Sequence, residues 1–143
     1  MKKRILSLAL SAAMALTMLP TGAFAASDKG KPPVYNKATG CYEISTPDQL
    51  LYLSGSWRDG APRDGHYVLT ADIDMTGVKG FKPIASKKDQ GFTGTFDGQF
   101  HAIKGLRVEY EKKYAGLFGY VGNQDDQAYI KDVVLLDCYV TGQ

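Results

Sequence analysis

The segments FTGTF, residues 92–96, and IKGLRV, residues 103–108, decide the fold, because a second pair of segments repeats their pattern. YAGLF at residues 114–118 is followed by IKDVVL at residues 130–135. The first halves begin at positions 92 and 114, an offset of 22, and the second halves begin at positions 103 and 130, an offset of 27. The difference of 5 equals the length of the polar segment NQDDQ at residues 123–127. Repetition at this spacing indicates stacked structural units.

The strands of this region are short, three to six residues, and glycine stands at their bends. A unit of this length with several short strands is typical of one coil of a parallel β-helix and not of a hairpin meander. Side chains alternate between the two faces of a strand, so apolar residues of successive coils should lie above one another. The expected stacked pairs are Phe118 on Phe96, Ile130 on Ile103, and Val133 on Leu106.

A helix over about residues 47–55 is predicted ahead of these coils. Thr46 can cap its first turn, Pro47 suits the first helical position and Gln49 can close a capping box. Leucines supply an apolar face, and Gly55 would end the helix. Such a helix would cover the first coil and protect its open edge. No comparable cap follows the last strand-like segment, so we expect a longer protein truncated at its C-terminal end.

Residues 1–25 have the pattern of a secretory signal peptide, with a basic start, an apolar run and AFA before the expected cleavage site. Residues 26–34 read as a flexible leader, and residues 35–143 as the β-helix segment with its N-terminal cap. The apolar run is shorter than the roughly 20 residues of a membrane span. We therefore expect a secreted or cell-surface protein with no membrane span after cleavage. Without the signal peptide the chain has 14 Lys and Arg against 15 Asp and Glu, a balance that gives no support to nucleic-acid binding.

The phrase FTGTFDGQFHAI, residues 92–103, resembles a recurrent phrase of bacterial surface β-helix proteins, and AGLFGYVG, residues 115–122, resembles the GLUG motif that follows it. ISTPDQL at residues 44–50 and YVLTADIDM at residues 67–75 are similar to the lead-in of that family. GLUG repeats also occur in the non-catalytic region of IgA1-protease-type zinc metallopeptidases. The resemblance implies a right-handed β-helix on an exported protein, often with a role in adhesion. This chain departs from the family phrase at Phe100 and Ala102, so the turn there is expected to be built differently.

The motif residues are interpreted as structural. They are Phe92, Gly94, Phe96, Asp97, Gly98, His101, Ile103, Gly116, Leu117, Phe118 and Gly119. His66 and His101 are too few for a metal site of three or more protein ligands, and no cofactor is expected. Asp72 and Asp74 flank Ile73 and should face outward together, either as an acid–base pair or, as we favour, as solvated carboxylates. The loop with Asn123, Asp125 and Asp126 offers only part of a calcium shell.

Tyr110 and Tyr114 are the best candidates for ligand contacts, because they bracket a polar loop and an exposed tyrosine has a flat apolar face with a polar tip. Packing within the fold is the alternative for both. Cys41 and Cys138 could form a disulfide in an exported protein, or remain as two buried thiols.

The expected function is a non-catalytic β-helical segment of an exported bacterial surface protein, with a role in adhesion to a host glycan or surface protein, or in domain presentation. No enzymatic activity is expected for the residues present. The alternative is the N-terminal fragment of a secreted enzyme, a metallopeptidase or a polysaccharide-active protein, with its active site beyond residue 143.

Overall fold

The computed structural model describes residues 30–143, and the predicted signal peptide and residues 26–29 lie outside the described residues. One α-helix, α1 (Pro47–Tyr52), and a 3-10 turn, η1 (Lys88–Gln90), accompany the strands of this part of the chain. The strands are β1 (Val34–Asn36), β2 (Cys41–Ile44), β3 (His66–Leu69), β4 (Ile73–Asp74), β5 (Thr95–Asp97), β6 (Ala102–Lys104), β7 (Arg107–Glu109), β8 (Tyr129–Lys131), β9 (Val134–Leu136) and β10 (Tyr139–Thr141). The fold is therefore mainly β, as predicted. No helix in residues 30–143 is long and apolar enough to cross a membrane.

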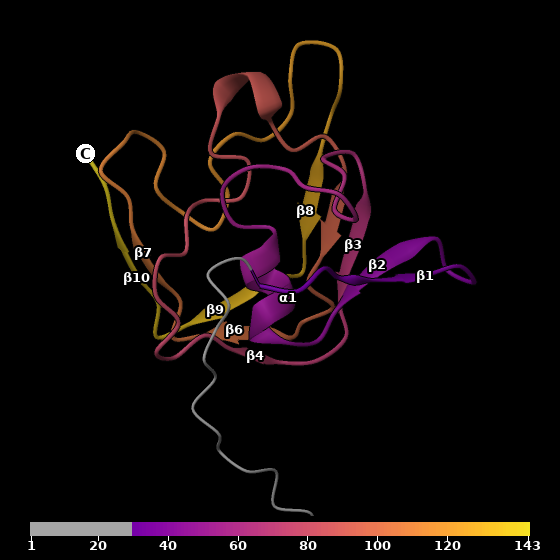
Figure 1. Ribbon diagram of the computed structural model, residues 1–143, viewed down its shortest axis with the longest axis horizontal. Coiled ribbons are helices and arrows are strands. Elements are labelled where there is room, and N and C mark those ends of the chain that lie inside the picture. The colour runs from indigo at the N-terminus through magenta and orange to yellow at the C-terminus, as the bar shows by residue number, and fades with distance from the viewer. Residues whose placement is uncertain (1–29) are drawn as a thin grey trace, which may run out of the picture.

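The strands form three sheets with the orders β1-β2-β3-β5-β8, β4-β6-β9 and β10-β7. Every pairing is parallel except the hairpin between β1 and β2. The chain passes through the three sheets in a repeated order. β5, β6 and β7 lie in the first, second and third sheet and form one layer, and β8, β9 and β10 lie in the same three sheets and form the next layer. Figure 1 shows the three sheets on different sides of a common interior, with the β1–β2 hairpin projecting outward.

The number of residues from one layer to the next is larger than the sequence repeat indicates. Residue 66 pairs with residue 95, 29 positions later, and residue 95 pairs with residue 129, 34 positions later. In the second sheet Ile103 pairs with Ile73, 30 positions earlier, and with Leu135, 32 positions later. The difference between 29 and 34 is again five residues, the length of the polar insert at 123–127. In the second sheet the two spacings differ by only two residues, so the increase matches the insert in the first sheet alone. The spacing inferred from the repeated phrases was too short in both sheets.

The predicted stacked pairs were wrong for the same reason. Phe96 pairs with Ile130 in the ladder, Ile103 pairs with Leu135, and β7, which follows Leu106, pairs with β10. Phe118 forms a parallel bridge to Ile84, although its ring still meets that of Phe96 edge-on at 5.3 Å. The strand pairings therefore do not place one of the two similar phrases directly above the other.

The helix α1 seals the interior, and its start is built as predicted. The Thr46 hydroxyl accepts a hydrogen bond from the Gln49 N–H at 3.3 Å, and the Gln49 side chain accepts one from the Thr46 N–H at 3.2 Å. Leu50, Leu51 and Leu53 are buried in the same apolar cluster as the inward residues of the strands. Burial of this face gives a helix of six residues a stability that it would lack in isolation.

The helix ends at Tyr52, three residues before the predicted end at residue 55. The Ser54 hydroxyl accepts a hydrogen bond from the Lys82 N–H at 2.7 Å, and the Gly55 N–H donates to the Pro83 carbonyl at 3.3 Å. Pairing with residues 82–83 therefore competes successfully with continued helix. Within the predicted leader of residues 26–34, the Lys31 N–H donates to the Asp48 carbonyl at 3.1 Å, and β1 already begins at Val34.

Two motif glycines allow the layers to approach each other. A Cβ atom at Gly94 would lie 2.0 Å from the Gly65 carbonyl oxygen, and one at Gly98 would lie 2.3 Å from the Asp132 carbonyl oxygen. Neither position can hold a side chain without moving the backbone of an adjacent layer. The packing of the layers therefore requires glycine at both positions.

The turn after Gly98, where the sequence departs from the family phrase, is built from two residues with positive φ. Gln99 and Phe100 both have positive φ, 47° and 61°, and the His101 N–H closes the turn on the Gly98 carbonyl at 2.8 Å. Two left-handed residues in sequence define a type I′ turn, which favours asparagine and glycine. Phe100 stands in this conformation with 75% of its surface exposed. Its ring therefore has no packing that offsets the backbone strain.

The outer face of the last layer is apolar and exposed. Leu135 and Leu136 of β9 are each 46% exposed, and Tyr139 and Val140 of β10 are 52% and 46% exposed. Among the described residues, β8, β9 and β10 each have a neighbouring strand on one side only. The core therefore lies between α1 and the layer of β5, β6 and β7, where Phe96, Ile103 and Val108 have no solvent exposure.

Side chains are buried in the layer of β5, β6 and β7 and half-exposed in the layer of β8, β9 and β10. This difference predicts how much stability is lost when a side chain in each layer is replaced by alanine. Ile103→Ala should lower the free energy of unfolding by about 2–5 kcal/mol, because it leaves a cavity between three strands. Leu135→Ala should cost about 1 kcal/mol, because its side chain is already half in water. Urea unfolding of residues 26–143 measures both values. Equal losses would contradict this location of the core.

The backbone strain at Phe100 leads to a second prediction about stability. Phe100→Gly should raise the free energy of unfolding by about 1 kcal/mol, because glycine adopts positive φ without the clash of a Cβ atom. Phe100→Ala is the matched control: it removes the same exposed ring but keeps the Cβ atom, so stability should not rise. Thermal unfolding of the two variants tests the difference, and a gain of equal size in both would show that the ring and not the backbone is unfavourable.

Candidate functional site

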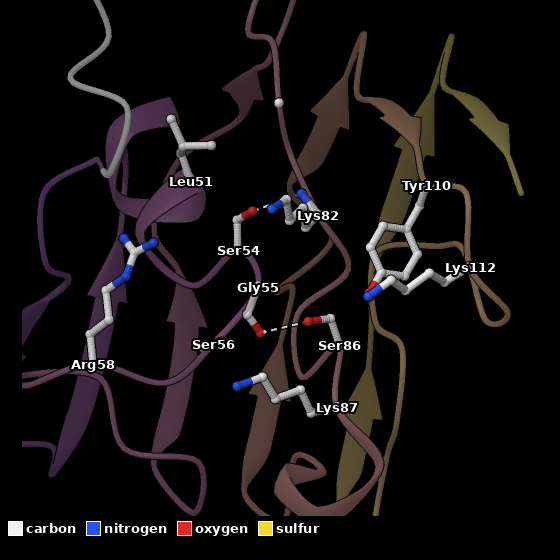
Figure 2. A pocket seen from close by; sticks show the side chains of 11 residues that line it. Leu51, Ser54, Gly55, Ser56, Arg58, Lys82, Ser86, Lys87, Tyr110 and Lys112 are labelled. Carbon is white, nitrogen blue, oxygen red and sulfur yellow. Dashed lines mark hydrogen bonds between the residues drawn. The ribbon is translucent and has the colours of Figure 1, made fainter.

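A polar pocket of about 460 Å³ lies beside the end of α1 and is the candidate functional site. Three segments that are distant in sequence form it: residues 51–58, residues 80–87, and residues 110–112. Figure 2 shows Ser54 and Gly55 at its centre, with Arg58 on one side and Tyr110 and Lys112 on the other. Its volume lies within the roughly 300–1,000 Å³ of small-molecule sites.

Hydrogen bonds between the first two segments make the floor of the pocket rigid. The Ser86 N–H and hydroxyl both donate to the Gly55 carbonyl at 3.2 Å. Ser54 also forms an antiparallel bridge with Ile84, whose side chain is buried. The floor is therefore joined to the core, and the side chains above it are held on a fixed base.

Four cations line the pocket: Arg58, Lys82, Lys87 and Lys112. No carboxylate is among the described residues that line it. Arg58 lies over the Tyr52 ring, with its guanidinium carbon 5.4 Å from the ring centroid, a cation–π contact that orients it. The pocket is thus basic, although residues 30–143 as a whole have 13 Lys and Arg against 14 Asp and Glu.

The two tyrosines predicted as ligand contacts are separated by the structure. Tyr110 is half-buried, packs against the core and lines the pocket. Tyr114 is 58% exposed outside the pocket and packs against Tyr120, with ring centroids 4.9 Å apart. Only Tyr110 therefore belongs to the candidate site.

Asp97 of the repeat phrase links the last two layers. Its carboxylate lies 2.8 Å from the Lys131 ammonium of β8 and accepts a hydrogen bond from the Gln99 N–H at 2.9 Å. The ion pair with Lys131, followed by the bond from Gln99, lowers the pKa of Asp97 below its usual value of 3.8. Asp97 thus contributes to the packing of the layers.

His101 and Asp72 lie together, which the sequence analysis did not predict. The His101 Nδ1 atom is 3.1 Å from the Asp72 carboxylate, which also accepts a hydrogen bond from the Ala102 N–H at 3.0 Å. These two bonds, chiefly that from Ala102, lower the pKa of Asp72. Asp72 and Asp74 are both exposed beside the buried Ile73, as predicted, but Asp74 accepts a hydrogen bond from the Thr76 N–H at 2.9 Å. Each carboxylate is therefore engaged with the backbone.

The other candidate metal ligands do not assemble. Within residues 30–143 no group of three or more His, Cys, Asp or Glu side chains could hold a metal ion. His66 lies 3.2 Å from the Thr95 hydroxyl. The Asn123 side chain accepts hydrogen bonds from the Asp125 and Asp126 N–H groups at 2.8 and 2.7 Å, so the insert folds on itself.

Cys41 and Cys138 are free cysteines, so the predicted disulfide alternative is wrong for this structure. Cys41 begins β2, and Cys138 precedes β10 in the last layer. β8 belongs to the same last layer as Cys138. In the first sheet, three strand spacings of about 4.8 Å separate β2 from β8. A disulfide requires Cα atoms within about 7 Å of each other. Both thiols are partly buried rather than fully buried.

Comparisons with known proteins indicate a fold but do not identify a family. No family model matches the chain. The chain is 33% identical over 111 residues to Halomucin of Haloquadratum walsbyi, a match that covers 71% of this chain and 1% of that protein. Its structure is similar to that of a candidate immunoglobulin A1 protease from Bacteroides ovatus, with a TM-score of 0.56 and 22% identity, covering 71% of this chain and 28% of that one. The chain thus corresponds to a small part of each protein that it matches.

The structural match agrees with the predicted likeness to IgA1-protease-type proteins at the level of fold. Membership of the GLUG family stays a prediction, because no family model matches. The basic residues of the pocket were not found from sequence. Arg58, Lys82, Lys87 and Lys112 follow no common spacing, and only the chain's path brings them together.

The lowered pKa values of the carboxylates predict acid sensitivity. A carboxylate whose pKa is lower in the folded state stabilises the fold above about pH 4, and this contribution is lost as the pH falls through the folded-state pKa. Asp97→Asn should therefore reduce stability at neutral pH and flatten the decline below about pH 4. Asp125→Asn, which changes an exposed loop carboxylate without an ion pair, is the matched control. Urea midpoints across this pH range test the prediction, and it is wrong if the two variants have the same pH dependence.

Proposed function

We propose that this chain is a non-catalytic segment of an exported bacterial surface protein, and that it presents a binding pocket on a β-helical scaffold. The observation that carries the proposal is the repeated visit to three sheets in parallel register, with paired positions about 30 apart in sequence. A scaffold of this kind presents side chains on a rigid surface of extendable length. Likeness to short parts of two much longer proteins supports a role as one segment of a larger assembly.

The finer architecture is part of the same proposal. The layers of β5–β7 and β8–β10 are successive coils of a right-handed parallel β-helix, and α1 is the cap at one end. The burial of the α1 leucines against the first layers supports the role of the cap. The signal-peptide pattern of residues 1–25 supports export to the cell surface or the medium.

The carboxylates support a structural rather than a catalytic role. Asp72 accepts its hydrogen bonds from the next layer, and Asp97 is paired with Lys131. A general acid or base needs a pKa near the operating pH, whereas the pKa values of Asp72, Asp74 and Asp97 are all lowered.

A second candidate function follows from the Bacteroides ovatus structure. Because that chain is a candidate protease and 28% of it matches, this segment could belong to a secreted enzyme whose catalytic residues lie elsewhere. A His-Glu-x-x-His zinc motif in a longer protein that carries this segment would favour the enzyme. Further GLUG repeats there, with an attachment signal, would favour the surface binder.

The proposal predicts export and binding. Expressed in a bacterial host, the chain should lose residues 1–25 and appear outside the cytoplasm, which intact mass and cell fractionation measure. Purified residues 26–143 should bind members of a panel of glycans and host surface proteins. A retained N-terminus would contradict export, and the absence of binding to every member of the panel would contradict adhesion by this segment.

A further inference from the structure

We propose that the pocket between residues 51–58, 80–87 and 110–112 binds an acidic saccharide through its carboxylate or sulfate group. The inference rests on the proposed binding function and assigns it a site and a ligand class. The structure supports it in three ways: the local charge, the polar groups without partners, and the shape of the pocket.

The pocket has an excess of positive charge that residues 30–143 as a whole do not have. Among the described residues, its lining has four cations and no acidic side chain, and the charge of residues 30–143 as a whole is −1. Lys82, Lys87 and Lys112 take part in no ion pair with the described residues. A bound oxyanion would be attracted by these cations, which line one concave surface. A second hollow, beside Phe81, differs because its Arg107 is paired with Glu109.

The neutral groups of the pocket fit a sugar better than a bare anion. The hydroxyl groups of Ser56 and Tyr110 form no hydrogen bond within residues 30–143, and both side chains line the pocket. Hydroxyl groups both donate and accept, as sugar hydroxyls require. The ring of Tyr110 adds an apolar wall beside Lys112, against which a sugar ring could lie (Figure 2).

The geometry favours one charged sugar unit over an extended polyanion. The cations come from both walls and surround a floor fixed by the Ser86 and Ser54 hydrogen bonds, rather than following a line along the surface. A volume of about 460 Å³ exceeds what a lone sulfate needs and leaves room for a sugar ring with water. A guanidinium and ammonium groups on one concave surface are the donors that carboxylates and sulfates prefer.

Isothermal titration calorimetry with defined oligosaccharides tests the proposal. Residues 26–143 are titrated with a galacturonate tetrasaccharide, with its neutral methyl ester, with a sulfated heparin tetrasaccharide, and with sodium sulfate. We expect at least one acidic saccharide to bind, at least about tenfold tighter than the neutral ester and than free sulfate. Binding should weaken as salt rises, because ions screen exposed charges.

Lys82→Gln with Lys87→Gln should weaken binding of the acidic saccharide about tenfold or more. Lys37→Gln with Lys104→Gln is the matched control, because it removes the same charge from exposed lysines that do not line the pocket. Thermal unfolding establishes that both double variants are folded. A separate single variant, Tyr110→Phe, should weaken binding of the saccharide but not of sulfate.

Three results would overturn the proposal. Equal loss in the two double variants would show general charge attraction, and equal affinity for the acid and its neutral ester would show that the oxyanion is not recognised. Free sulfate bound as tightly as the saccharides would show an anion site only. If no acidic saccharide binds while neutral glycans or proteins on the panel do, this inference is wrong and the proposed function stands; if nothing binds, both are wrong.

Discussion

The close parallel pairing of backbone between layers is the constraint on which the rest of the structure depends. Each short strand contributes only two to four residues to a ladder, so no single strand pair is stable alone. Stability comes from repetition, because each layer buries the apolar residues of the layer beside it. Gly94 and Gly98 permit this approach at points where any side chain would meet the neighbouring backbone. The floor of the pocket is joined to this core by the hydrogen bonds between Gly55 and Ser86 and by the bridge between Ser54 and Ile84.

The sequence was sufficient to predict a mainly β fold and the start of the helix α1. The capping box of Thr46 and Gln49 is a local signal, and local hydrogen bonds realise it. The end of α1 could not be predicted in the same way, because the bonds that end it come from residues 82–83. The length of the layers was misjudged for a related reason. Similar phrases have similar local structure, but register is decided by pairing between residues about 30 apart.

The candidate site was predicted only at Tyr110. Tyrosine beside a polar loop is a recognisable pattern, whereas the pocket lysines are single charges in separate loops that resemble ordinary solvated residues. The pocket lysines lie together only because residues 54–55 pair with residues 82–86, and no periodicity in the sequence predicts that pairing. The prediction for Tyr114 had the same basis as that for Tyr110. The structure separates them, because Tyr110 lines the pocket whereas Tyr114 packs against Tyr120 outside it.

The locations of polar groups explain how the scaffold and the site can differ in chemistry. Carboxylates of the layers are engaged with the backbone or with a lysine: Asp72 with Ala102, and Asp97 with Lys131. The described residues that line the pocket have the opposite composition, cations and hydroxyl groups without carboxylates. Lys82, Lys87 and Lys112 form no ion pair with the described residues, so their ammonium groups have no acidic partner there. The scaffold thus uses acidic groups to hold its layers together, whereas the proposed recognition of an acidic saccharide would use basic groups.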